Sequence, residues 1–158
     1  MDSVIIRPIS AAEARPVRQA VLRPGLPPET TVYPGDDDVD SFHAGAFVNG
    51  VLVGIATLHH RPPPGEADAG AWQLRGMAVV PEQQGRGLGR ALVQACGQAA
   101  AARGGTRVWC NGRVSALGFY RSLGFETLGD IFQTPHSGPH YRMVLILWYN
   151  IAARAPIV

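Results

Sequence analysis

The chain has 158 residues, of which 46% are hydrophobic and 16% are charged, with a formal net charge of +2. This length suits one domain over residues 1–158, and the composition excludes an intrinsically disordered chain. There is no basic run typical of a nucleic-acid surface and no apolar run long enough to cross a membrane, so we expect a cytoplasmic protein with neither kind of partner.

Capping and turn patterns predict how the elements begin. Ser10 and Glu13 form a capping box at a helix start, and Pro16 predicts a kink or a later start. Asn49-Gly50 between two strand patterns favours a β-hairpin. In chain order we expect a strand over 4–9, a helix over 10–23, strands over 42–48, 51–60 and 71–80, a helix over 87–103, a strand over 106–110, a helix over 114–123, strands over 125–132 and 140–149, and a tail over about 150–158.

The segment from Pro24 to Asp40 is predicted to be a long loop with four aspartates, Asp36, Asp37, Asp38 and Asp40. Two hypotheses remain open for this acidic cluster: a solvated loop, or attraction of a cationic amine. The two cysteines, Cys96 and Cys110, lack the spacing of a metal site and are expected to be reduced core thiols. No metal is expected.

The most informative stretch runs from Met77 to Arg90. An apolar run ends at Pro81, three glycines follow at alternate positions, and a helical pattern begins directly after them. Glycines allow a close backbone approach, and the first N–H groups of a helix can bind a phosphate. Arg86 and Arg90 add positive charge. A glycine-rich connection without a ligand is the alternative.

Three phosphate-binding turns can be compared with this stretch. A P-loop requires Gly-Lys-Ser/Thr, and a Rossmann turn requires a third glycine where this chain has Arg90 or Leu92. The third turn, Gln/Arg-X-X-Gly-X-Gly/Ala, is met by Gln84, Gly87 and Gly89. It resembles motif A of the GCN5-related N-acetyltransferases, the GNAT superfamily.

A second motif also resembles this family. Asn111 at a strand end precedes a helix pattern with Ala116, Phe119 and Tyr120, which closes in Leu-Gly-Phe over 123–125. This resembles GNAT motif B, about 30 residues after motif A. The resemblance implies an α/β (α+β) acyl-CoA N-acyltransferase fold. Its sheet would be mixed and mostly antiparallel, with six to seven strands flanked by helices, and splayed between strands ending near Val80 and Cys110. The cofactor-binding core would span about 71–125.

The resemblance implies transfer of an acetyl group from acetyl-CoA, as co-substrate, to an amine. The strand edge would pair with the pantetheine arm, an N–H near Ala78 or Val79 would hold the oxyanion, and Asn111 could bind the pantetheine. Tyr120 would give a proton to the leaving thiolate. The cofactor-binding residues implied are Met77, Ala78, Val79, Gln84, Gly85, Arg86, Gly87, Leu88, Gly89, Arg90, Asn111, Ala116, Phe119 and Tyr120.

The general base is not assigned by the resemblance. Many relatives use a glutamate on the strand before motif A, but the polar members of this strand are Gln73 and Arg75. His60, Glu66 and His140 are candidates, and His140 is preferred because the last strands commonly line the acceptor side. Arg75 could bind an acidic acceptor or pair with an acid.

The predicted function is therefore N-acetylation of a primary amine on a small molecule or peptide. A non-catalytic module that binds or senses acyl-CoA is the alternative, since the missing acid on the strand permits it. A homodimer through the last strands is compatible with the family.

Overall fold

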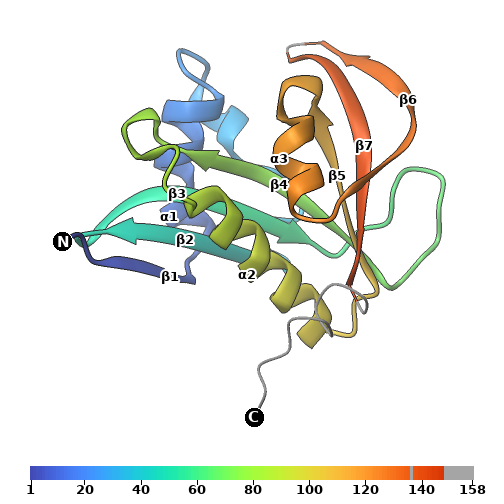
Figure 1. Ribbon diagram of the computed structural model, residues 1–158, viewed down its shortest axis with the longest axis horizontal. Coiled ribbons are helices and arrows are strands. Elements are labelled where there is room, and N and C mark those ends of the chain that lie inside the picture. Colours follow the sequence, from blue (N-terminus) through green and yellow to red (C-terminus); the bar gives the residue numbers. More distant parts are fainter. Residues whose placement is uncertain (136, 148–158) are drawn as a thin grey trace. The chain divides into compact units, whose positions relative to one another are not determined.

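The computed structural model describes residues 1–135 and 137–147 (Figure 1). The predicted tail and the end of the predicted last strand lie outside these residues. The strands are β1 Val4–Pro8, β2 Phe42–Val48, β3 Val51–His59, β4 Ala71–Val79, β5 Arg107–Arg113, β6 Glu126–Thr134 and β7 Gly138–Ile146. The helices are α1 Ala11–Val17, the π-helix Arg18–Leu22, the 3-10 turns Pro28–Thr31, Pro81–Gln83 and Val114–Ala116, α2 Leu88–Ala102 and α3 Leu117–Ser122. The predicted order of elements is confirmed.

The strands form a mixed sheet with the hydrogen-bonded order β1-β2-β3-β4-β5-β7-β6. The ladders β1–β2, β2–β3, β5–β7 and β6–β7 are antiparallel, whereas β4 and β5 run parallel. The β4–β5 ladder joins 71–73 to 107–109, and both strands continue beyond it. The predicted mixed α/β sheet is confirmed.

The chain divides into two compact units. Unit 1 comprises residues 1–60 and 74–99, and unit 2 comprises 61–73 and the chain from residue 100 onward. The residues of β4 and α2 are shared between the two units. No helix in the described part of the chain combines the length and apolar character needed to cross a membrane.

Local sequence explains the framework of unit 1. The Ser10 side chain accepts a hydrogen bond from the Glu13 N–H, and the Glu13 side chain accepts one from the Ser10 N–H, so the predicted capping box is formed. The predicted hairpin is also formed, because Asn49 and Gly50 take φ of 50° and 82° in a two-residue turn. After Pro16 the helix widens into the π-helical turn Arg18–Leu22.

The two helices of unit 1 cover opposite faces of its strands. Ile55 on β3 packs with Ala14 and Val17 of α1. The neighbouring Gly54 faces α2, since a Cβ atom there would lie 3.0 Å from a methyl group of Leu92. Adjacent residues of a strand point to opposite faces, so β3 lies between α1 and α2.

Unit 2 is built on the β5–β7–β6 ladders, with α3 packed on β5. A Cβ atom at Gly112 of β5 would lie 3.1 Å from the Tyr120 ring and 3.0 Å from Met143, so glycine allows this close approach. Tyr120 also meets Phe125 edge-to-face, with ring centroids 5.4 Å apart. Strand β5 extends to Arg113, three residues beyond its predicted end at Cys110, because its ladder with β7 continues to the Arg113–His140 pair.

Candidate active site

The glycine-rich turn connects the end of β4 to α2 within unit 1. After the 3-10 turn Pro81–Gln83, the Gln84 side-chain amide donates a 2.9 Å hydrogen bond to the Val79 carbonyl. Gln84 therefore closes the turn. Gly85 and Gly87 take φ of 79° and 82°, and a Cβ atom at either position would meet no heavy atom within 4 Å. The turn thus combines a left-handed backbone with open space beside it.

Helix α2 begins directly at this turn. The Ala91 N–H donates a 3.1 Å hydrogen bond to the Gly87 carbonyl, four residues earlier, so Gly87 accepts a bond from the first turn of the helix. The first four N–H groups of a helix have no partner one turn earlier in that helix, and they lie at the positive end of its dipole. Leu88 is buried and anchors the helix start, while Gly89 leaves its first turn without a side chain. This start suits an anionic group such as a diphosphate.

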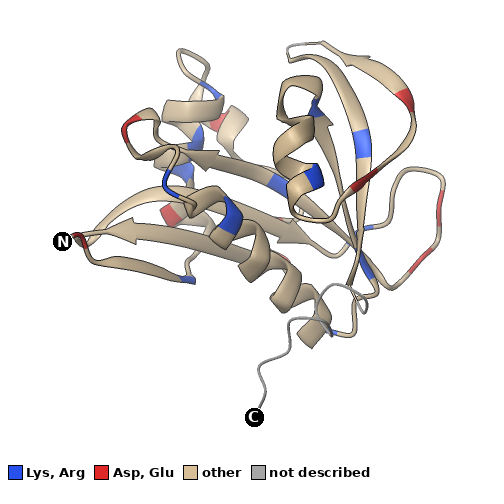
Figure 2. Cartoon of the chain, in the orientation of Figure 1, with Lys and Arg blue, Asp and Glu red and all other residues tan. Residues whose placement is uncertain are grey.

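Positive charge is concentrated at this end of α2. Figure 2 shows basic positions in the glycine-rich turn and the first turn of α2, and the rest of the helix carries no charged residue. Arg86 makes a partly exposed ion pair with Asp2 at 2.9 Å and also donates to the Gln83 side chain. An exposed pair of this kind contributes little, so an anion can compete with Asp2 for Arg86. Arg90 stands on the first helical turn.

The middle of β4 is more accessible than its ends. Residues Arg75, Gly76 and Met77 are half-buried, whereas Ala78 and Val79 are buried. Gly76 takes φ of 62°, which interrupts the extended backbone at this point. The predicted cofactor edge, Met77 to Val79, therefore begins next to an irregularity in the strand and runs toward the glycine-rich turn.

In unit 2, Tyr120 lies on α3 with 8% of its surface exposed. Burial, reinforced by the nearby Cys110, raises the pKa of the Tyr120 phenol above its usual value, so the phenol is neutral at physiological pH. Phe119 packs edge-to-face on Tyr120 with centroids 5.1 Å apart. A neutral phenol can donate a hydrogen bond to a developing thiolate.

The other motif B residues lie on β5 and in the turn before α3. Asn111 is exposed on β5, and its side-chain oxygen accepts a long, 3.4 Å hydrogen bond from Arg142. Ala116 closes the 3-10 turn that precedes α3 and is half-buried. Both cysteines are free and buried, and burial raises the pKa of each thiol to about 12. Neither is a thiolate at neutral pH, which agrees with core thiols.

The three candidate bases differ in their surroundings. His140 on β7 is 7% exposed, and its Nδ1 lies 2.9 Å from the Gly138 carbonyl. A carbonyl only accepts, so Nδ1 carries the proton of the neutral ring and Nε2 keeps a lone pair that could take a proton. His60 is bonded to Asp40 at 2.8 Å, and Glu66 is paired with Arg107. The Asp40 carboxylate also accepts, so a neutral His60 ring, like that of His140, carries its proton on Nδ1.

The predicted site residues fall into two groups. Unit 1 brings the β4 edge, Met77 to Val79, together with the turn and helix start over 84–90. Unit 2 holds Asn111 on β5, Ala116 in the turn before α3, Phe119 and Tyr120 on α3, and His140 on β7. Within the described residues, no group of three or more His, Cys, Asp or Glu is arranged to hold a metal ion.

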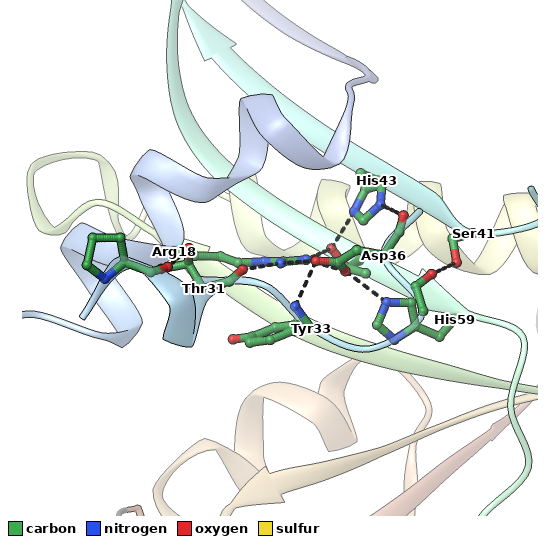
Figure 3. Close-up of polar contacts among 10 residues, drawn as sticks. Arg18, Thr31, Tyr33, Asp36, Ser41, His43 and His59 are labelled. Atoms are coloured by element: carbon green, nitrogen blue, oxygen red, sulfur yellow. Dashed lines mark hydrogen bonds and ion pairs between the residues drawn. The ribbon is translucent and has the colours of Figure 1, made fainter. Parts of the chain in front are cut away.

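A buried polar network in unit 1 was not predicted (Figure 3). Arg18 is fully buried and donates to both carboxylate oxygens of Asp36, at 2.5 and 3.0 Å, and to the Thr57 hydroxyl at 2.7 Å. His59 approaches the same carboxylate at 3.0 Å, and His43 approaches the Asp36 carbonyl at 2.9 Å. Asp36 is therefore neither solvated nor available to attract an amine, unlike both sequence-based hypotheses for the acidic cluster.

The charge state of this network follows from its contacts. Burial alone would raise the pKa of Asp36. Hydrogen bonds from Arg18, the Tyr33 N–H and His59, together with the Arg18 charge, lower it instead from 3.8 to about 2. The carboxylate is thus ionised throughout the physiological range and holds the segment around Tyr33 against the π-helical turn.

One sequence signal pointed to Arg18. Ala11, Ala14, Arg18 and Val21 are spaced by three and four residues, so Arg18 falls on the buried face of its helix. A charged residue at a core position requires a buried partner. Its partner, Asp36, lies in a loop next to the exposed Asp37 and Asp38, and no periodic spacing there indicates that Asp36 is buried.

Comparisons with known proteins agree with the geometry. The sequence model of the Acetyltransferase (GNAT) family matches residues 14–125. The uncharacterized N-acetyltransferase YitI of Bacillus subtilis (strain 168) is 33% identical over 138 residues, which are 87% of this chain and 93% of that protein.

Two solved structures show the same fold. ElaA of Escherichia coli matches with a TM-score of 0.74 at 16% identity, covering 90% of this chain and 99% of that chain. The yncA protein of Salmonella typhimurium, whose structure contains its cofactor acetyl-CoA, matches with a TM-score of 0.70 at 19% identity, covering 91% and 94%.

Proposed function

This chain belongs to the Acetyltransferase (GNAT) family, and we propose that it transfers the acetyl group of acetyl-CoA to a primary amine of a small molecule or peptide. The observation that supports this most strongly is the turn between β4 and α2. Left-handed glycines, open space beside them and the positive helix start converge there, next to a strand that can pair with an amide-bearing arm.

In the proposed reaction the amine nitrogen attacks the thioester carbonyl, a C–N bond forms and the C–S bond breaks. The products are the N-acetylated amine and free coenzyme A. An N–H of β4 near Ala78 or Val79 would donate to the oxygen on which negative charge develops. His140 would take the proton that the attacking amine loses, through its Nε2.

Tyr120 is the proposed donor to the leaving sulfur. Its raised pKa means that the phenol is a weak acid, so its main contribution would be a hydrogen bond to the thiolate as charge develops there. The main-chain donors and arginines over 84–90 would hold the diphosphate. Asn111, Ala116 and Phe119 would contact the pantetheine arm.

The test combines binding and turnover. Calorimetry should detect acetyl-CoA binding, and a thiol-release assay across a panel of primary amines should detect free coenzyme A. Tyr120→Phe should lower kcat about 10- to 100-fold while acetyl-CoA affinity is retained, because only the transition-state hydrogen bond is lost. Tyr141→Phe on β7 is the matched control and should behave as the unmodified chain.

The missing acid on β4 also favours a second candidate, a module that binds acyl-CoA without turnover. Binding of acetyl-CoA with no thiol release from any amine would support this module and contradict the enzyme. Absence of binding would contradict both.

A further inference from the structure

We propose that Arg142 of β7 binds an anionic group of the acceptor, and that this group lies about two residue lengths or more from the amine that is acetylated. This inference rests on the proposed acetyl transfer and specifies its second substrate as a peptide-like amine with a free carboxylate. It is carried by contacts within unit 2, on the strand that also holds His140.

Arg142 and His140 share one face of the β5–β7 ladder. Asn111 of β5 pairs with Arg142, and Arg113 pairs with His140, in one continuous register. Directly opposed residues of an antiparallel ladder point to the same face, and so do residues two apart on one strand. Gly112, between the two β5 residues, faces α3. Arg142 and His140 therefore lie on the face that is turned away from α3.

Two contacts hold the guanidinium of Arg142 in place. Its Cζ atom lies 5.2 Å from the centroid of the Trp109 ring, a cation–π distance. This ring is 2% exposed, and its Nε1 donates a 2.7 Å hydrogen bond to the Arg61 carbonyl, which fixes its orientation. The Arg142 Nε also donates a long, 3.4 Å hydrogen bond to the Asn111 side-chain oxygen. The guanidinium thus lies beside residues 109 and 111 of β5.

These contacts leave one edge of the guanidinium for a ligand. The cation–π contact uses its face, and the Nε–H points at Asn111, whereas the other four N–H donors belong to the two Nη atoms. Neither Nη atom of Arg142 bonds to another residue of the described chain, and the side chain is half-buried rather than enclosed. An edge with two parallel N–H donors matches a carboxylate.

The acids of unit 2 do not neutralise this charge. Glu66 and Asp68 both pair with Arg107. The remaining acids of the unit, Glu126 and Asp130, are exposed on β6. Within the described residues, neither forms an ion pair with the guanidinium on β7. A carboxylate of the acceptor would therefore supply a counter-charge that the unit itself does not provide.

The position of His140 sets the length of the acceptor. Two residues along a strand span about 6.6 Å. The His140 ring leans away from Arg142, because its Nδ1 lies 2.9 Å from the Gly138 carbonyl and its ring meets Phe132 at a centroid distance of 6.0 Å. The Arg142 side chain leans the opposite way along the ladder, toward Trp109.

An amine at the His140 Nε2 and an anion at Arg142 are thus about 7 Å or more apart. One extended residue spans about 3.3–3.6 Å, so the carboxylate of a free α-amino acid would not reach the guanidinium. The carboxylate of a dipeptide or a longer chain would reach it. The geometry therefore favours an extended acceptor over a single amino acid.

The experiment measures thiol release from acetyl-CoA with glycine, diglycine, triglycine and the C-terminal amide of each. For the unmodified chain, kcat/KM should rise about tenfold or more from glycine to the longer peptides, and each longer peptide should exceed its amide about tenfold. Arg142→Gln should raise KM for the longer free peptides about 10- to 100-fold, as for loss of a charge-assisted hydrogen bond, with kcat and the KM for acetyl-CoA unchanged. Arg142→Lys should restore part of the preference, because it retains the charge without the planar fork.

Calorimetry provides a readout that does not require turnover. Triglycine titrated into protein saturated with coenzyme A should bind about tenfold more tightly than triglycine amide. Arg142→Gln should remove this difference, since the amide has no negative charge to lose. Loss of the difference in binding, with kcat retained, separates recognition of the carboxylate from an effect on the chemical step.

Two other arginines test whether the effect belongs to this position. Arg121→Gln is the matched control, since Arg121 is exposed on α3, which packs on the other face of β5, and it should leave both preferences intact. Arg113→Gln should also leave them intact. Arg113 pairs directly with His140, so an anion bound there would favour glycine over the longer peptides.

Four results would overturn the proposal. They are equal use of glycine and the longer peptides, equal use of acids and amides, a preference that survives Arg142→Gln, or one that Arg113→Gln abolishes. Thiol release with other amines but with none of these peptides overturns it as well and leaves the proposed function intact. Failure to bind acetyl-CoA instead contradicts the proposed function itself, so the two failures are distinguishable.

Discussion

Replacement of Asp36 by asparagine should strongly destabilise the protein. The change keeps the size of the side chain but removes the negative charge that faces Arg18, whose side chain is 0% exposed. In addition, an asparagine has an NH₂ group in place of one carboxylate oxygen, so either Arg18 or His59 loses its hydrogen-bond acceptor. Removing one partner of a buried ion pair costs about 3–5 kcal/mol, because the other charge stays buried without compensation.

This cost is a large part of the usual stability of a folded domain, about 5–15 kcal/mol. For a chain of this size it corresponds to a fall in Tm of roughly 6–20 °C. Urea unfolding should be followed by both far-UV circular dichroism and tryptophan fluorescence. Coincidence of the two transitions tests whether the two compact units unfold together, as two-state treatment requires.

Asp37→Asn provides the matched control. Asp37 is the next residue and is exposed, so the same chemical change should alter stability by less than about 0.5 kcal/mol. The double variant Arg18→Met/Asp36→Leu should recover much of the loss, because apolar replacement of both partners removes the stranded charge. A loss below about 1 kcal/mol for Asp36→Asn, or equal losses at the two aspartates, would refute this account of the network.

Three other outcomes are expected. Because the folded-state pKa of Asp36, about 2, lies below its usual 3.8, the network stabilises the fold above pH 4, and roughly 2 kcal/mol should be lost as the pH falls from about 4 to 2; acid titration of Asp36→Asn should lack this component. Gly87→Val should weaken acetyl-CoA binding at least tenfold by calorimetry, whereas Gly65→Val, at the same φ of 82° and equally open, should cost similar stability without changing affinity; equal affinity losses would contradict the assigned turn. Ser10→Ala should lower stability by about 1 kcal/mol in urea unfolding through loss of the capping box, and no change would mean that Glu13 alone supports the helix start.

Much of the fold could be predicted because its signals are local. The capping box, the Asn49-Gly50 turn and the glycine-rich turn each depend on residues within a few positions of one another. The backbone torsions that these turns require are met by the residues themselves. Motifs A and B were recognisable for the same reason, since each spans a single strand-to-helix connection.

Some boundaries and conformations depended on neighbours in space. Strand β5 extends to Arg113 because that residue pairs with His140 of β7. The left-handed conformation of Gly76 occurs where the side chains of Tyr33 and Arg18 pack closely on β4. A single residue in a strand pattern carries no sign of such packing.

The acidic segment shows the same limit most clearly. By sequence, Asp36 was one of four similar aspartates, and the helical spacing that places Arg18 on a buried face did not indicate its partner. Arg18, Asp36 and His59 are 18 and 23 residues apart along the chain, so only folding brings them together.

The sequence by itself determined the family resemblance, the order of elements and the turn suited to a diphosphate, because these depend on short-range torsions and hydrogen bonds. Only the tertiary structure decided which acid pairs with the buried Arg18 and which of the four aspartates is removed from solvent. Those properties depend on solvent exclusion and on distances between segments remote in the chain, and no local pattern encodes either.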